Sequence, residues 1–514
     1  MTPFVERTTN RPATRTVNAE GGDAYTMPKD VELYGAVATF LFQDKFYEKS
    51  DDRINRIRTL ASELCAKNDE EFVGQLAVYS REQMHLRSVS VALAIELAKL
   101  HSGDNLVQKV LNRVVARPDE IMEALAYYEM INGKIKPLSK QVQKGLASAF
   151  NKFDEYGFAK YNRDGNITLR DALFLVHPKP EDEKNQLLFD KIANDSLETP
   201  QTWETQISKS GQDAKTPEEK EAAKLKAWGD MIDSGKMGYM AILRNLRNFL
   251  EAGVSHDHMA KVCARLADEK SVLKSKQFPF RFLSAYNEIK QLTSPHAAMV
   301  IDALEEAIRA SAKNVSGFDY NTRVLIANDV SGSMGGTISK HSKIRSMDVG
   351  LILGMILRHN CKSVVTGVFG EQYATLLTPS GNILQNTENM KVPNVGHSTN
   401  GHLVLRAHEG ERDEFDKVFL ITDTQLWNNS GFYSWGGNGG GGDTFRKAWH
   451  DYKRNVAPNA KLYIVDVAGH GNTPISIMDK DVYYVAGWSD KIFDVLDAIE
   501  NGSGAVEEIR KIEL

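Results

Sequence analysis

The sequence has few cysteines and no long hydrophobic run. Its three cysteines (Cys65, Cys263 and Cys361) are far apart, in apolar helical or strand-edge settings, which predicts reduced core thiols in a cytoplasmic protein. No apolar run reaches the roughly 18 residues that a membrane span needs, and the polar start of the chain has no signal-peptide core. We therefore expect no membrane partner.

The sequence also lacks the short motifs of common catalytic chemistry. It contains no H-E-x-x-H, no G-x-S-x-G, no G-x-x-x-x-G-K-[ST] and no Cys-x-x-Cys. The glycine run 436–442 lacks the Lys-Ser/Thr that a phosphate cradle requires. We expect a binding protein that is not an enzyme and has no catalytic residues.

No excess of positive charge is present either. Lys and Arg number 63 against 68 Asp and Glu, giving a formal net charge of −5. Any nucleic-acid-binding surface must therefore be a local patch. A chain of 514 residues also exceeds what one hydrophobic core normally serves, which predicts two or more domains.

Residues 25–312 have helical apolar spacing almost throughout, as in Ile54-Ile57-Leu60-Leu64 and Ile121-Leu125-Tyr128. Short connections separate many helices, too many for one bundle core. A solenoid of stacked helical pairs is the expected arrangement.

The remaining residues alternate strand-like runs with helical patterns. Apolar runs occur at Val324–Ala327, Ser363–Phe369, Lys417–Thr422 and Lys461–Val467, and Lys343–Arg358 has helical spacing. This alternation predicts a parallel sheet covered on both faces, with ligands beyond the carboxyl ends of its strands.

A D-x-S-x-S element follows the first of these strands. Asp329, Ser331 and Ser333 alternate by two, so a loop can turn their oxygens toward one point. One carboxylate and two hydroxyls suit Mg²⁺ and leave charge for an external anionic oxygen. The alternative is a Ser/Gly turn in which Asp329 caps the next helix. The strand Val418–Thr422 brings Asp423 to the same edge, and a loop before a later helix can bring Thr399 there.

These residues resemble the metal-ion-dependent adhesion site of the von Willebrand factor A domain. The resemblance implies five ligands, with Asp423 acting through water: Asp329, Ser331, Ser333, Thr399 and Asp423. Where that family has Gly-Gly-Thr, this chain has Gly-His-Ser-Thr, so Ser398 is an alternative to Thr399.

The helical region resembles the TROVE module of the Ro ribonucleoprotein family. The matching segments are Met237–Asn248, Lys276–Ala285, Leu169–Leu173 with His177–Pro180, and, near the end, Lys461–Val465 with Ala486–Asp490. Their order, TROVE first and von Willebrand A second, implies a helical-repeat RNA-binding domain over 23–315 and an α/β domain over 316–514. The polar start of the chain predicts a flexible N-terminal arm over 1–22.

The resemblance implies an α-helical ring of HEAT-like repeats followed by a doubly wound α/β domain. In this family small structured Y RNAs bind the outer surface, and single-stranded 3′ ends of misfolded RNA enter the hole. We therefore expect a cytoplasmic monomer that acts in RNA quality control or processing, with an exoribonuclease as a possible RNA-tethered partner.

The segment Lys134–Lys144 is the best candidate for an RNA-binding surface. Lys140 and Lys144 are four residues apart on one helix face, and Lys134 and Lys136 precede them. The resemblance adds His177. The alternative is a solvated helix face. Arg81, His85 and Arg87 are weaker candidates that would face the hole or simply solvent.

Two other functions stay open: a metal-dependent protein-adhesion adaptor with a helical scaffold, and a cation-assisted nuclease. The aromatic and glycine-rich insertion 427–443 begins next to Asp423. Its Trp427, Phe432, Tyr433 and Trp435 would form a mobile flap over the metal site, or else pack on the domain's own surface.

Overall fold

The computed structural model describes residues 13–40, 50–162, 165–200, 202–210, 212, 215–313, 315, 317–338, 342–427, 443–489 and 491–514. The chain divides into two compact units. One, the α/β unit, contains residues up to Leu60 together with Ala312–Glu508, and the other, the helical unit, contains Ala61–Ser311 and Ile509–Leu514.

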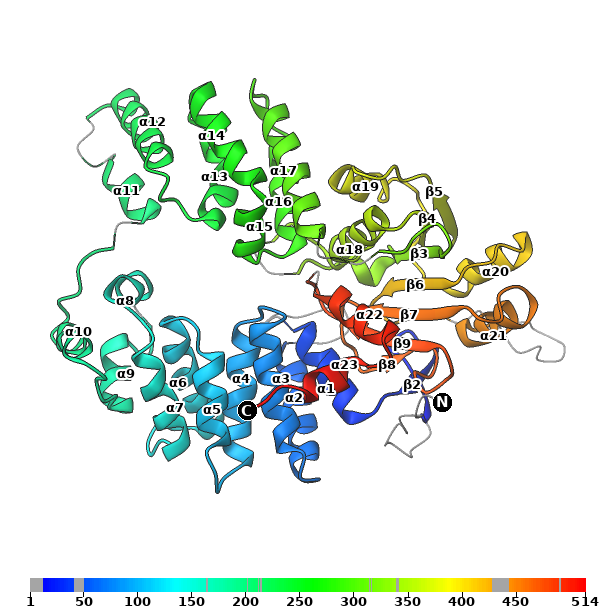
Figure 1. Ribbon diagram of the computed structural model, residues 1–514, viewed down its shortest axis with the longest axis horizontal. Helices are drawn as coiled ribbons and strands as arrows, with labels where there is room; N and C mark the ends of the chain where they lie inside the picture. Colours follow the sequence, from blue (N-terminus) through cyan, green and yellow to red (C-terminus); the bar gives the residue numbers. More distant parts are fainter. Residues whose placement is uncertain are drawn as a thin grey trace. The chain divides into compact units, whose positions relative to one another are not determined.

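The α/β unit is built on a six-stranded sheet with the order β5-β4-β3-β6-β7-β9 (Figure 1). Its strands are β3 (Arg323–Asp329), β4 (Ser363–Phe369), β5 (Tyr373–Leu376), β6 (Lys417–Thr422), β7 (Lys461–Asp466) and β9 (Val482–Ala486). All pairings are parallel except that of the edge strand β5 with β4.

The central strands are buried on both faces. Every residue of β6 is buried, as are all of β3 except Arg323, and successive side chains of a strand point to opposite faces. Helix α18 (Ser346–Asn360) packs against β3 and β6. Further helices in the C-terminal part of this unit include α19 (Ile383–Asn389), α20 (His402–Glu411), α21 (Phe445–Asn455) and α22 (Ile492–Glu500). The four expected strands and the expected helix are confirmed.

The strand order places a topological switch between β3 and β6. After β3 the chain crosses to β4 on one side, and after β6 it crosses to β7 on the other. In doubly wound sheets this reversal opens a crevice beyond the carboxyl ends of the two strands. Asp329 ends β3 and Asp423 follows β6, so both side chains belong to this crevice.

The N-terminal segment departs from the expected domain boundaries. Instead of a flexible arm over 1–22, Arg15–Val17 forms strand β1, which pairs with β2 (Asp23–Thr26). Strand β2 in turn pairs with β8 (Asn472–Thr473), and helix α1 (Lys29–Ala38) packs against β9. These short elements depend on partners more than 400 positions along the chain, which local patterning does not reveal. Residues 1–12 lie outside the described residues.

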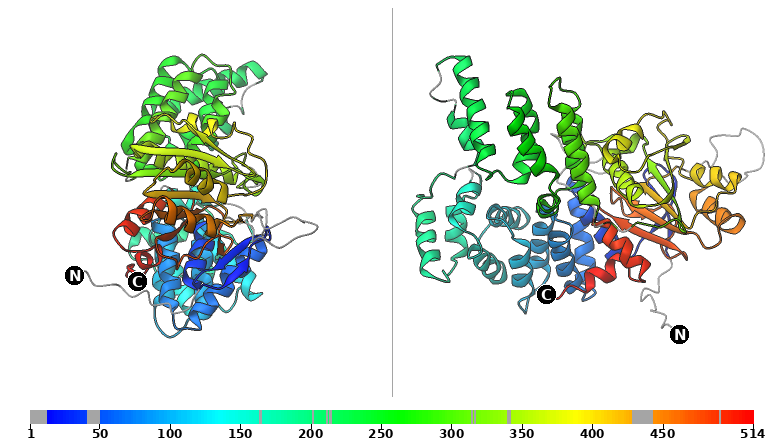
Figure 2. Two further views of the ribbon diagram at one scale, coloured as in Figure 1. Left: turned by 90° about the vertical axis from the view of Figure 1, so that its right-hand side faces the viewer. Right: turned by 45° about the horizontal axis from the view of Figure 1, so that its top comes forward.

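The helical unit is a stack of helices joined by short connections (Figures 1 and 2). Neighbours in the chain pack together, as α3 does with α4 and α11 with α12, and so do α3 with α5 and α5 with α7. Its helices are α3 (Glu70–Glu82), α4 (Ser88–Leu100), α5 (Leu106–Val114), α6 (Asp119–Asn132), α7 (Lys140–Phe150), α8 (Glu155–Tyr161), α9 (Leu169–Val176), α10 (Glu183–Ala193), α11 (Trp203–Ser210), α12 (Pro217–Asp233), α13 (Tyr239–Glu251), α14 (His256–Ala267), α15 (Glu269–Ser275) and α16 (Pro279–Ile289). Helices α2 (Ser50–Cys65), α17 (Ala297–Ala312) and α23 (Ala505–Arg510) cross the unit boundary.

The helix ends follow from local sequence. Thr168 and Asp171 form a reciprocal capping box at the start of α9, and Ser255 accepts a hydrogen bond from the His258 amide at the start of α14. The cap at Ser255 shows that His256-Asp257-His258 is the first turn of a helix. The fold class, helical repeats followed by a doubly wound α/β unit, is confirmed.

The three cysteines are free and buried, as expected. Burial raises the pKa of each thiol to about 11, so all three are protonated near neutral pH. Among the described residues, no helix combines the length and apolar character that crossing a bilayer demands.

Candidate functional site

Asp329 lies fully within the crevice between β3 and β6. Its side chain is 1% exposed. The Ser331 amide donates to Asp329 Oδ1 over 2.9 Å, and the Thr422 hydroxyl donates to Oδ2 over 2.6 Å. Asp329 therefore fixes both its own loop and the end of β6.

The other residues of the D-x-S-x-S element meet Asp423 at the same point. The hydroxyls of Ser331 and Ser333 are 3.3 Å apart, and the Ser333 hydroxyl donates to the Asp423 carboxylate. The Gln425 amide donates to Asp423 Oδ1 over 3.0 Å. The structure thus brings together four of the five predicted ligand residues, all of them buried.

Thr399 lies in a loop that is tied to this crevice through its backbone. The Gly332 amide donates to the His397 carbonyl over 2.9 Å, and the Trp427 amide donates to the Thr399 carbonyl over 2.8 Å. Thr399 is 2% exposed, whereas Ser398 points to solvent. Burial beside the crevice favours Thr399 over Ser398 as the loop's ligand.

The crevice disfavours the charged form of both aspartates. Burial raises the pKa of Asp329, and burial together with the charge on Asp329 raises the pKa of Asp423. Among the described residues, neither aspartate forms an ion pair with a lysine, arginine or histidine. Two buried carboxylates with adjacent hydroxyls form a hard oxygen donor set that fits Mg²⁺.

The insertion after Asp423 falls mostly outside the described residues, which stop at Trp427 and resume at Asp443. Trp427 is fixed by its hydrogen bond to Thr399 and is half-buried. Asp443 accepts from Arg406 of α20 over 2.6 and 2.7 Å. Both ends of the insertion are therefore anchored, and the aromatic flap stays a prediction.

A second group of potential metal ligands occurs at the end of α20, where His408, Glu411 and Asp413 lie close together. The two ring nitrogens of His408 are already engaged, one with the Tyr373 hydroxyl at 2.9 Å and the other with Asp413 at 3.1 Å. These hydrogen bonds explain the cluster as a structural one.

The predicted RNA-binding lysines are exposed on and before α7. Lys140 and Lys144 face solvent on α7, and Lys134 and Lys136 face solvent in the preceding segment. The opposite face of the helix is buried through Val142 and Leu146, both 0% exposed. The helix is thus held so that its lysines face outward, and RNA contact by them stays a prediction.

His177 is also exposed and follows α9, which packs on α7. The Asn151 side chain at the end of α7 donates to the Lys179 carbonyl over 2.9 Å. Lys140 and Asn151 are separated by about 16 Å along the helix axis, at 1.5 Å per residue. His177 therefore belongs to the opposite end of α7 from Lys140, with Lys144 between them.

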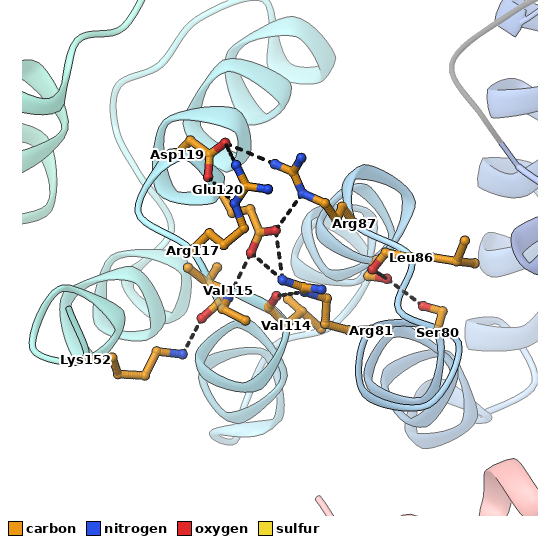
Figure 3. A network of polar contacts seen from close by, with 12 residues as sticks. Ser80, Arg81, Leu86, Arg87, Val114, Val115, Arg117, Asp119, Glu120 and Lys152 are labelled. Carbon is orange, nitrogen blue, oxygen red and sulfur yellow. Dashed lines mark hydrogen bonds and ion pairs between the residues drawn. The ribbon is translucent and has the colours of Figure 1, made fainter. Parts of the chain in front are cut away.

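Arg81 and Arg87 have a structural role that the sequence does not reveal. Figure 3 shows both guanidinium groups directed at Glu120 of α6. Arg81 contacts the two Glu120 oxygens at 3.0 and 3.2 Å, and Arg87 contacts one at 3.2 Å. Glu120 is completely buried and also accepts from the Ala116 amide over 2.8 Å. These arginines join α3 and α4 to α6 and are not free for RNA.

Arg281 of α16 is a candidate cation that no sequence pattern singles out. Burial, and then the charge of Arg244 on α13, lowers the pKa of Arg281, and α13 packs against α16. Among the described residues neither Arg244 nor Arg281 forms an ion pair. Arg247, by contrast, is neutralised by Glu251 and Glu288 at 2.7 and 3.2 Å. Arg244 and Arg281 are thus two positive charges on packed helices of the helical unit.

Comparisons with known proteins agree with this organisation. The TROVE domain family model matches residues 43–214 and 195–316, more than half of the chain. The chain is 26% identical to telomerase protein component 1 of Rattus norvegicus and to that of Mus musculus. Each of these alignments covers 54% of this chain and 13% of the relative, so the chain spans only a small part of those proteins.

A solved structure shares the fold over most of the length. The crystal structure of the Deinococcus radiodurans Ro (Rsr) protein aligns with a TM-score of 0.59 at 18% sequence identity. The alignment covers 91% of this chain and 99% of that one. On the match to the family model, the chain belongs to the TROVE family of Ro-like, RNA-binding ribonucleoprotein proteins.

Proposed function

We propose that this protein holds a small structured non-coding RNA on a lysine surface consisting of Lys134, Lys136, Lys140 and Lys144. The observation that carries the proposal is the orientation of α7, whose buried Val142 and Leu146 direct two lysines outward within a TROVE domain. Lysines four residues apart repel each other, and an RNA phosphate between them relieves that repulsion.

The wider role that we propose is RNA quality control or processing. Single-stranded 3′ ends of misfolded RNA would enter among the helical repeats, and the bound structured RNA would tether an exoribonuclease. Arg244 and Arg281 are our candidates for contact with the single-stranded ends, because neither forms an ion pair with a carboxylate among the described residues.

The salt dependence of RNA affinity tests the lysine surface. A double Lys140→Ala, Lys144→Ala variant should weaken binding of a structured small RNA and flatten the slope of log affinity against log salt by up to about two counterions' worth. The matched control is Lys220→Ala, Lys224→Ala, which removes two lysines with the same spacing from α12. Equal slopes for the two double variants would contradict the proposal.

A second function is proposed for the α/β unit: Mg²⁺-dependent binding of a carboxylate on a protein partner, as in von Willebrand factor A domains. The supporting observation is the buried cluster of Asp329, Asp423, Ser331 and Ser333 in the switch-point crevice. When bound, Mg²⁺ would supply the positive charge that attracts the partner's carboxylate, and these residues would hold it.

Calorimetric titration with Mg²⁺ tests this site. Asp329→Ala should abolish Mg²⁺ binding, because it removes the carboxylate at the end of β3, and should leave RNA affinity largely intact because the lysine surface belongs to the other unit. Unchanged Mg²⁺ affinity would refute the metal assignment.

A further inference from the structure

Phe174 is a large apolar side chain that α9 leaves in contact with solvent. Its side chain is 51% exposed, and the Arg170 guanidinium, one turn earlier on the same helix face, lies 5.9 Å from the centre of its ring. The core of the unit is served by the opposite face of the helix, which buries Leu169, Ala172, Leu173 and Val176. A single exposed ring is ordinary on a protein surface, so its surroundings decide whether it has a role.

Among the described residues, the cations on either side of Phe174 in the chain form no ion pair. These cations are Arg170 and Lys179, and both are exposed. The carboxylate next to Arg170 in sequence, that of Asp171, is engaged in capping α9, where it accepts from the Thr168 amide over 3.0 Å and from the Thr168 hydroxyl over 2.7 Å. The positive charges beside the ring are therefore able to contact an external anion.

The face of α7 that carries Lys140 and Lys144 leads to this end of α9. At 3.6 residues per turn, Lys140, Lys144 and the helix-ending Asn151 lie within about 40° of one another around the helix axis. The Asn151 side chain donates to the Lys179 carbonyl over 2.9 Å, so this face ends at the segment that follows α9. Phe174 lies in the last turn of α9, only five positions before Lys179. The lysines of α7 are thus followed by an exposed aromatic ring.

A ring beside a row of cations can do what the cations alone cannot. Lysine contacts to phosphates position an RNA but do not distinguish paired from unpaired nucleotides. The faces of paired bases are covered by their neighbours in a duplex, whereas an unpaired base is free to stack on an aromatic ring or a guanidinium plane. Phe174 and Arg170 supply one group of each kind on a single helix face.

We propose that Phe174 and Arg170 form a stacking site for an unpaired RNA base, next to the lysine surface that contacts the phosphates of the same RNA. This inference rests on the proposed RNA binding and names the feature of the RNA that the protein selects. The selected RNA has a paired segment followed directly by unpaired nucleotides. A duplex with blunt ends contacts the lysines alone and is held more weakly.

The affinities of the full-length protein for two synthetic RNAs test the stacking site. One RNA is a hairpin with a single-stranded overhang, and the other is the same hairpin with a blunt end. Phe174→Ala should weaken binding of the overhang RNA at least about fivefold, the loss expected when one stacked base loses its ring, and should leave binding of the blunt RNA within about twofold. Phe174→Tyr keeps a ring and should bind both RNAs as wild type does.

The matched control is Tyr320→Ala, which removes an exposed aromatic ring from the α/β unit, where Tyr320 is 78% exposed. Its affinity for both RNAs should equal that of wild type. The slope of log affinity against log salt separates stacking from charge. Phe174→Ala removes no cation and should leave the slope unchanged, whereas Lys140→Ala, Lys144→Ala should flatten it.

The outcomes separate the stacking site from the RNA binding on which it rests. If wild type binds the overhang RNA and Phe174→Ala binds it as tightly as Tyr320→Ala does, the stacking site is refuted and RNA binding stands. An equal loss of affinity for both hairpins refutes it as well, because the ring then does not recognise unpaired bases. If wild type binds neither hairpin, the proposed RNA binding is wrong and the stacking site is overturned with it.

Discussion

Removing the charge of Glu120 should destabilise the helical unit more than any surface substitution. Glu120 is completely buried and compensates Arg81, whose side chain is only 12% exposed, and Arg87, whose side chain is 41% exposed. Glu120→Gln leaves the Arg81 charge buried without a carboxylate. Breaking a buried pair in this way costs about 3–5 kcal/mol. The lower figure applies here because Arg87 reaches solvent and also contacts Asp119.

The measurement is thermal unfolding followed by far-ultraviolet circular dichroism. For a unit of this size, a loss of about 3 kcal/mol lowers the midpoint by roughly 6–12 °C. Glu82→Gln is the matched control, because Glu82 also pairs with an arginine, Arg113, at 2.8 and 2.6 Å. The side chains of that pair are 34% and 36% exposed, so its loss costs at most about 1 kcal/mol.

Equal unfolding midpoints for the two variants would show that Glu120 does not stabilise a buried charge on Arg81. Such a result would mean that water reaches Arg81 in the folded protein, or that another carboxylate replaces Glu120. It would also mean that Arg81 is available to contact RNA, because its pairing with Glu120 would no longer occupy it.

Two further predictions concern the α/β unit. Arg406 lowers the pKa of both Asp443 and Asp451 through hydrogen bonds. The stability that these two ionised carboxylates contribute is therefore fully present above about pH 4. It is lost as the pH falls through their lowered pKa values in the folded protein. Arg406→Gln should accordingly shrink the drop in unfolding midpoint between neutral and acidic solution, and an unchanged drop would contradict this. For the insertion, Mg²⁺ should change the tryptophan emission that Trp427→Phe and Trp435→Phe remove, and should alter protease cleavage in the glycine run 436–442. If neither signal responds, the aromatics do not form a flap.

Much of the α/β unit could be predicted because parallel strands buried on both faces are continuous apolar runs. Val324–Ala327 and Val418–Thr422 are such runs, and the residues that end them reach the same edge of the sheet wherever the connecting helices lie. The meeting of Asp329 with Asp423 follows from that rule. The hydrogen-bond partners of each side chain do not follow from the rule, because the hydrogen bond from Thr422 to Asp329 joins residues 93 positions apart.

The contacts that local sequence could not reveal are those between distant segments. The local sequence at the start of the chain predicts a flexible arm, because β1 and β2 are short and are stabilised by contacts with β8 and Leu426. From its local sequence Arg81 is likewise predicted to be a surface cation, because its buried partner Glu120 lies 39 positions later in the chain. The exposed face of α7 was predictable, since its periodicity separates lysines from Val142 and Leu146.

Sequencing the RNA that crosslinks to this protein in its native cells tests the proposed RNA binding most directly. We expect a few small structured non-coding RNAs, strongly enriched over a Lys140→Ala, Lys144→Ala variant expressed at the same level. Recovery of no RNA above background, or of the same broad mixture with both proteins, would contradict it.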